Sequence, residues 1–373
     1  MRALLVLVCG CTAASSAPTP SAEPDVPAPA SSPAPKRPVP RVGDPAASGR
    51  VIAAQVVAAV DDQPARDRPA HARAGQRVTL YAAITVDDAG ARAIYSDAPA
   101  LVLAGKPAAA RPLARAPQLE LRWNRIEPAV ASMSNGDTPK DFHFEPIDYR
   151  ATPIDGAAGQ GSLAADVRPT LTPDHGGGIG TMRYQIVVLQ GDRVIASAGP
   201  EARRGKGSGG VTDAVTRVSI RRDDTFLGYM TELYNQPYIW ASEGLTNEAH
   251  QSERLEGADC ADLMIYGQRR LGNKLAYTWT GALANVTTLI AAGTRGEDGV
   301  FRDARGAAIP FPRIGDLMLF PRHVGALAAD RGKPGVLDDQ DLMMHTLFDS
   351  PKEQAIGETG YADRPVEVRR FRR

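Results

Sequence analysis

Between residues 51 and 221, apolar and polar side chains alternate in short runs that glycine, proline and aspartate separate. The run at residues 75–86 has many β-branched positions and ends in the turn sequence Asp87-Asp88-Ala89-Gly90. Residues 118–123, 183–197 and 215–221 alternate in the same way, and a Gln-Gly-Asp turn at residues 190–192 marks a hairpin. This period is typical of half-buried strands, so we expect an all-β, immunoglobulin-like sandwich over residues 50–215.

Beyond residue 222 the spacing of apolar residues becomes helical. They lie at i, i+4, i+7 and i+8 from Phe226, which predicts a helix that begins at Asp223 and ends before Pro237. Asp259 can cap a second helix, and Gly272 is well placed to end it. Buried strands are expected at residues 317–320, from residue 323, and at residues 341–348. Residues 222–373 should therefore form a domain of helices and sheet.

The amino-terminal residues have a different pattern. A short apolar run ends in Gly10-Cys11, which resembles a bacterial lipobox, so residues 1–11 are predicted to be a lipoprotein signal with Cys11 as the lipidated cysteine. Residues 12–48 are mostly alanine, proline and serine, which predicts a disordered linker. We expect a lipid anchor on the periplasmic face of the cell envelope. The outer membrane is favoured because Thr12 is not the aspartate linked to inner-membrane retention.

Charge and histidine spacing narrow the possible partners. Lys and Arg number 43, as do Asp and Glu, and this balance argues against a nucleic-acid partner. His143 and His175 are isolated and lack ligand spacing, so we expect no metal and no cofactor. No stretch after the signal has 18 consecutive apolar residues, so no transmembrane helix is expected. Three cysteines are too few for a disulfide framework.

Cys260 is the only cysteine after residue 11, and it follows the predicted helix cap. The helix dipole there should lower the pKa of the thiol, and the helix-start amides can stabilise an oxyanion. Two adjacent antiparallel strands can place His323 to deprotonate the thiol and His345 to orient His323. His250 lies in a polar loop and is expected at the surface. A buried structural cysteine is the alternative interpretation of Cys260.

An ordered set of short motifs carries a resemblance to a known family. The set is Pro237-Tyr238-Ile239-Trp240, Asp259-Cys260, Ile314-Gly315-Asp316-Leu317, His323-Val324-Gly325 and His345. Over residues 222–350 it resembles the NlpC-type cell-wall peptidases, which implies a papain-like α+β fold. The resemblance makes Cys260 the nucleophile, His323 the general base and His345 its orienting partner. It also implies that Tyr238 lines the cleft and that Asp259 binds the amine end of the substrate.

Members of this family commonly cut the amide between D-glutamate and a diamino acid in peptidoglycan stem peptides, through a thioester. Here Ala261 and Asp262 follow the cysteine, whereas the family usually has serine and glycine, so the bond that is cut stays open. A non-catalytic cell-wall binding lipoprotein on the same fold is one alternative. An amidase or acyltransferase with another substrate is a second. For the β-rich region, whose partner is unknown, the sequence suggests a spacer or a binding module.

Overall fold

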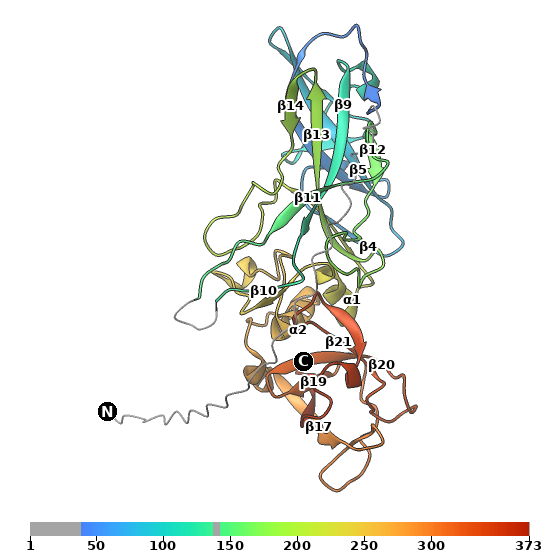
Figure 1. Cartoon of the computed structure of the whole chain (residues 1–373), viewed down its shortest axis with the longest axis vertical. Coiled ribbons are helices and arrows are strands. Elements are labelled where there is room, and N and C mark those ends of the chain that lie inside the picture. Colours follow the sequence, from blue (N-terminus) through green and yellow to red (C-terminus); the bar gives the residue numbers. More distant parts are fainter. Residues whose placement is uncertain (1–38, 137–141, 373) are drawn as a thin grey trace, which may run out of the picture. The chain divides into compact units, whose positions relative to one another are not determined.

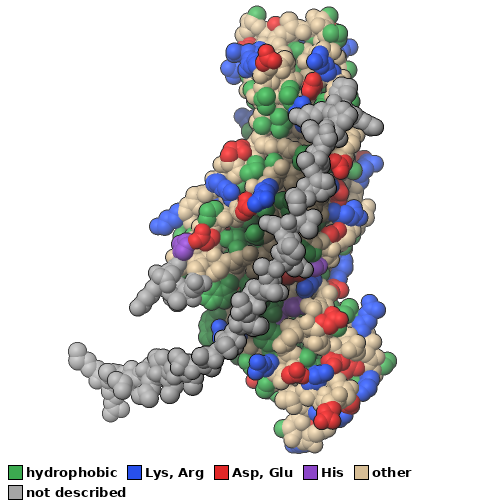
Figure 2. Space-filling view, in the orientation of Figure 1, with side chains coloured by type: hydrophobic (Ala, Val, Ile, Leu, Met, Phe, Trp, Pro, Cys, Tyr) green, Lys and Arg blue, Asp and Glu red, His purple; other side chains and the backbone are tan. Residues whose placement is uncertain are grey.

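In the part of the chain that the structure describes, β-strands dominate and form three seven-stranded sheets and one two-stranded sheet (Figure 1). The computed structural model describes residues 39–136 and 142–372. The predicted signal, Cys11 and residues 12–38 of the predicted linker lie outside these ranges. Within them, no helix has the length and apolar character needed to cross a membrane. On the face shown in Figure 2, basic and acidic side chains are interspersed, in keeping with their equal numbers.

Two of the large sheets pack against each other through a common core, to which Leu80 and Ile84 contribute from one sheet and Leu121 and Tyr184 from the other. The first sheet has the order β1 (Arg41–Val42), β9 (Leu119–Pro128), β13 (Gly180–Gln190), β15 (Thr216–Arg221) and β4 (Ala70–Arg73), with β11 (Tyr149–Pro153) on β9 and β14 (Arg193–Ala196) on β13. The second has the order β12 (Ser162–Ala164), β5 (Val78–Asp88), β2 (Arg50–Val60), β3 (Ala65–Arg66), β7 (Leu101–Leu103) and β8 (Lys106–Ala108), with β6 (Ala91–Tyr95) on β5.

The prediction of an immunoglobulin-like sandwich is wrong. Such a sandwich is built from antiparallel sheets, whereas here β15 pairs with β4, and β3 with β7, in parallel. Period-two alternation predicts the strands, and the hairpin of β13 and β14 follows its turn residues, but long-range pairing decides the topology. The end of the predicted linker is also ordered, because Arg41 and Val42 pair with β9.

The third seven-stranded sheet belongs to the carboxy-terminal part of the chain. Its order is β18 (Phe301–Arg302), β17 (Thr287–Arg295), β23 (Val366–Phe371), β19 (Leu317–Phe320), β20 (His323–Ala329), β21 (Leu342–His345) and β22 (Lys352–Ala355). The helix α2 (Cys260–Arg270) packs on one face of it, where Leu263 and Met264 share a core with Val324 and Ala326. A second core, which includes Leu327, covers the other face.

The prediction of a papain-like α+β fold is wrong as well. The described residues contain two α-helices, α1 (Phe226–Met230) and α2, of five and eleven residues, beside many strands. The helix expected from Asp223 to Pro237 is cut short because its hydrogen bonding changes to a 3-10 turn at Thr231–Leu233. Its cap is Thr225, whose hydroxyl accepts a hydrogen bond from the backbone of Gly228. Helical spacing of apolar residues therefore overstated the helix content.

The basic carboxy terminus is part of a sheet. Val366–Phe371 form β23 between β17 and β19, and the guanidinium of Arg370 lies 2.6 Å from the carboxylate of Asp316. That ion pair fixes the last strand to the turn before β19.

One short strand links the two parts of the chain. β10 (Ser132–Ser134) pairs in parallel with β16 (Tyr238–Trp240), which lies just before the loop leading to α2. The next residue, Asn135, is fully buried, and its amide donates hydrogen bonds to the carbonyl oxygen of Ala241 (3.0 Å) and to the side chain of Gln251 (2.7 Å). The β-rich region thus supports the strand that carries Tyr238, and it is more than a spacer.

Candidate functional site

Cys260 is the first residue of α2, and Asp259 is its N-cap, as the sequence predicts. One carboxylate oxygen of Asp259 accepts hydrogen bonds from the backbone amides of Ala261 and Asp262, both at 2.9 Å. Capping therefore occupies two of the helix-start amides that were expected to serve an oxyanion. The backbone N–H of Cys260 itself is the first-turn amide that the cap leaves free.

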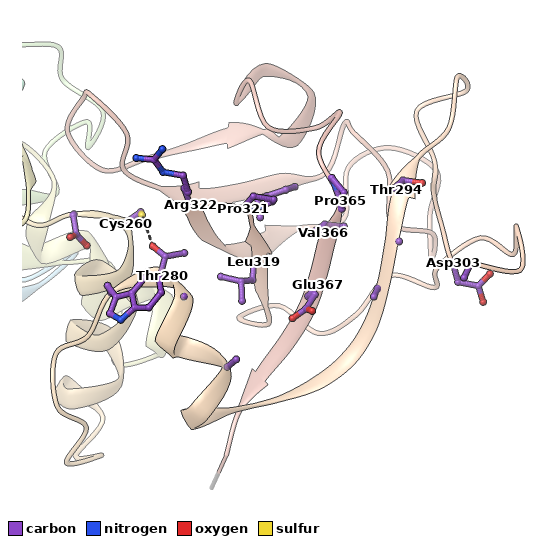
Figure 3. Close-up of a pocket in the computed structure, with 18 of the residues that line it drawn as sticks. Cys260, Thr280, Thr294, Asp303, Leu319, Pro321, Arg322, Pro365, Val366 and Glu367 are labelled. Carbon is purple, nitrogen blue, oxygen red and sulfur yellow. Dashed lines mark hydrogen bonds between the residues drawn. The ribbon is translucent and has the colours of Figure 1, made fainter. Parts of the chain in front are cut away.

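The side chain of Cys260 lines a cavity of about 980 Å³ (Figure 3), a volume at the upper end of the range for ligand sites. Its sulfur lies 3.5 Å from the hydroxyl oxygen of Thr280. Four segments complete most of the wall: residues 238–241 with β16, residues 279–284, residues 292–294 on β17, and residues 319–322 at the turn between β19 and β20. Arg302, the last residue of β18, and Asp303 also line the cavity.

The environment of the sulfur raises the pKa of the thiol to about 12, and the prediction of a lowered pKa is wrong. Burial is the main cause, and the negative charge of Asp259 adds to it. Hydrogen bonds from Thr280 and from the backbone of Val324 act in the opposite direction but are weaker. Removal from water thus outweighs the helix dipole, and Cys260 rests as a neutral thiol.

His323 and His345 meet on neighbouring antiparallel strands, β20 and β21. Nε2 of His323 lies 3.0 Å from Nδ1 of His345, and both rings are buried. Burial lowers the pKa of His323 to about 3 and that of His345 to about 4, so both imidazoles are neutral near pH 7.

The hydrogen bonds of Gln354 determine the tautomers of His323 and His345. The amide nitrogen of Gln354 donates to the carbonyl oxygen of Glu358 at 2.9 Å, so its oxygen faces Nε2 of His345 at 3.1 Å. An amide oxygen only accepts, hence Nε2 of His345 carries the proton and Nδ1 accepts from Nε2–H of His323. Nδ1 of His323 is then an unprotonated nitrogen, and it is buried without a hydrogen-bond partner among the described residues. An unsatisfied buried acceptor is uncommon, and this one is the basic atom of the pair.

The histidines lie behind the cavity wall and do not line it. Residues 319–322 form that wall and lead directly into His323, while the backbone of the next residue, Val324, hydrogen bonds to the thiol of Cys260. No hydrogen bond joins the sulfur to the His323 ring in this structure. The two groups must approach each other for proton transfer, as is common for catalytic pairs without a bound substrate.

Tyr238 and Asp259 also line the cavity, next to Cys260. Burial raises the pKa of the Tyr238 phenol, which therefore stays protonated and can donate a hydrogen bond. Burial also raises the pKa of Asp259, to about 6, and Asp262 lies close enough to share a hydrogen bond with it. The carboxyl of Asp259 is thus engaged by the helix start, which leaves little of it for a substrate amine.

Several residues of the site had no signal in the sequence. Thr280 contacts the sulfur, Gln354 fixes the tautomer, and the ring of Tyr361 lies 4.6 Å from that of His323. Trp279 also lines the cavity and is largely exposed. His250 was expected at the surface, but only 4% of it is exposed.

Comparison with protein-family models, with curated proteins and with solved structures finds no match for the chain. Its function is therefore inferred from the residues and the geometry described above.

Proposed function

We propose that the protein is a cysteine hydrolase with Cys260 as nucleophile, His323 as general base and His345 as the residue that orients His323. One observation carries the proposal: the unprotonated Nδ1 of His323 has no hydrogen-bond partner among the described residues, while Nε2 of the same ring is hydrogen bonded to His345. A purely structural histidine pair would be expected to satisfy this atom. The neighbouring residue, Val324, contacts the thiol of Cys260 through its backbone.

The first half of the reaction forms a thioester. As the sulfur attacks the carbonyl carbon of an amide, the thiol proton passes to Nδ1 of His323, because both groups are neutral beforehand. The oxyanion that develops accepts hydrogen bonds from the free backbone N–H of Cys260 and from the phenol of Tyr238. His323 then gives its proton to the leaving amine, and the C–N bond breaks.

The second half restores the enzyme. A water molecule attacks the thioester carbonyl while Nδ1 of His323 takes one of its protons. Collapse of the tetrahedral intermediate breaks the C–S bond, the sulfur recovers the proton from His323, and a carboxylic acid leaves. His345 keeps Nε2 of His323 protonated throughout, so that Nδ1 is always the atom that exchanges protons with substrate.

Peptidoglycan stem peptides are the proposed substrate class. The ordered motifs from Pro237 to His345 support this, as does the predicted lipid anchor at Cys11, which would hold the enzyme at the periplasmic face of the envelope. The volume of the cavity suits a peptide with several side chains. A binding protein without activity would need neither a free base nor a thiol on the cavity wall.

Digestion of purified sacculi tests the proposal. The wild-type protein should release fragments with new amino termini, detected by mass spectrometry, whereas Cys260→Ala should release none. In the presence of hydroxylamine, the wild type should also yield hydroxamates, because the amine competes with water for the thioester. Binding to sacculi without any cleavage would instead favour a cell-wall binding protein. Inactivity on sacculi combined with hydrolysis of other amides would favour the amidase alternative.

A further inference from the structure

The turn between β19 and β20 has an unusual residue at its second position. Pro321 and Arg322 connect Phe320 to His323, which pair across the two strands. Arg322 has a φ of 68°, in the left-handed region. A turn with proline first and a positive φ second favours glycine or asparagine, because a β-carbon crowds the backbone there. Strain of this kind is concentrated at functional sites.

The side chain of Arg322 lines the cavity and has no hydrogen bond or ion pair with any residue that the structure describes. Figure 3 shows it extending from the turn on the side of the cavity where Cys260 lies, whereas Asp303 is at the far end. Arg302 provides a contrast on the same cavity, since its guanidinium is paired with Asp298 at 2.9 Å. Arg322 is thus the cation of this cavity that is available to a ligand.

We propose that Arg322 binds a carboxylate of the substrate next to the scissile amide and makes the enzyme selective for it. The inference rests on the proposed function and deepens it. A guanidinium matches a carboxylate with two parallel hydrogen bonds, and it stays charged at any physiological pH. A glutamate that uses one carboxyl group in the scissile amide retains a second, which is either free or amidated. Arg322 distinguishes these two forms.

The position of Arg322 in the chain gives this contact a second effect. It directly precedes His323 in a two-residue turn, so a ligand that holds its guanidinium also holds the start of β20. Substrate binding is thereby coupled to the placement of the general base relative to Cys260. This coupling supplies the approach of the two groups that catalysis requires.

Binding measurements test the inference without depending on hydrolysis. Two D-glutamyl-diamino-acid peptides, one with the second carboxyl free and one with it as a carboxamide, are titrated into Cys260→Ala protein by calorimetry. The carboxylate peptide should bind about 10- to 100-fold more tightly, as expected for a hydrogen-bonded charge pair. Arg322→Gln in the same background should abolish this preference, while Arg322→Lys should retain part of it. The matched control Arg302→Gln should leave the preference unchanged.

Arg322→Gly separates binding from folding. Glycine adopts the left-handed conformation freely, so this variant should unfold at the same or a higher denaturant concentration and still lose the preference. Equal affinity of the two peptides, or a preference that survives Arg322→Gln and Arg322→Gly, would overturn the inference even if cleavage of sacculi is confirmed. A preference that depends on Arg322 in a protein that cleaves nothing would support the carboxylate site and refute the hydrolase.

Discussion

Two buried histidines near the start of α2 share the same burial and charge state, yet their surroundings differ in kind. His323 and His250 are both buried, and burial lowers the pKa of each to about 3. The ring of His250 makes two hydrogen bonds: Nδ1 accepts one from the backbone of Ser252, and the second joins the ring to the backbone of Ser242. The ring also stacks on that of Tyr277, with 3.6 Å between the ring centroids. In His323, Nε2 is hydrogen bonded to His345, whereas Nδ1 has no hydrogen-bond partner among the described residues.

This difference teaches that burial alone does not mark a catalytic histidine. Burying an imidazole without satisfying both nitrogens costs free energy, and a structural residue avoids that cost. His250 therefore belongs to the framework that supports the loop before Cys260. In His323 the acceptor Nδ1 remains unsatisfied, as expected for a general base. Substitution of each histidine in turn tests the difference between them.

The largest expected effect is the loss of activity in His323→Gln. Removal of a general base should lower kcat/KM by about 10³-fold. The unfolding free energy should change by about 1 kcal/mol or less, because the amide of glutamine can still donate to Nδ1 of His345, and Nδ1 of His323 makes no hydrogen bond that could be lost. Hydrolysis assays and urea titrations measure the two quantities. Near-normal activity in this variant would show that the open nitrogen is not the base.

The reverse outcome is expected for His250→Phe. Phenylalanine keeps the ring against Tyr277 but removes the hydrogen bonds to the backbone of residues 242 and 252, which should cost about 2–3 kcal/mol of unfolding free energy. Activity per folded molecule should fall less than tenfold, since no catalytic atom is changed. The same urea titrations and active-site thiol counts provide the measurement. A loss of activity as large as that expected for His323→Gln would contradict the assignment of His250 as a structural residue.

The smallest effect concerns pH. The pKa of His250 is about 3 in the folded protein and near 6.5 in an unfolded chain, so only the unfolded state gains this proton as the pH falls from 7 to 5. Stability is therefore lost in this window, by about 2 kcal/mol for one such histidine. His250→Phe should lose about that much less than the wild type between pH 7 and pH 5. Parallel stability curves for the two proteins would contradict the prediction.

Local patterns in the sequence predicted local structure well. The cap at Asp259, the end of α2 near Gly272, and the adjacent strands of His323 and His345 follow from short-range spacing and turn chemistry. These features are set by neighbours along the chain, where hydrogen-bond geometry leaves few choices. The pairing of the two histidines could therefore be expected from the sequence.

The predictions that were wrong concern features that are determined by long-range packing. Whether His250 is buried and whether the thiol pKa of Cys260 rises both depend on segments distant in sequence. The parallel pairs of the β-rich sheets and the low helix content have the same origin. Thr280 and Gln354 could not be singled out either, since a threonine or a glutamine near a strand carries no chemical signature of its own.

The pairing of β10 with β16 also limits how the chain can be divided. A fragment that began at the predicted boundary of residue 222 would keep Tyr238 but lose Ser132–Ser134, and β16 would have an open backbone edge beside the cavity. Open edges invite pairing with other molecules, so such a fragment is a candidate for aggregation. The pocket that Asn135 fills beside Ala241 would be left empty too. The carboxy-terminal region is thus not a portable module, and grafting it elsewhere would require rebuilding one wall of its own site.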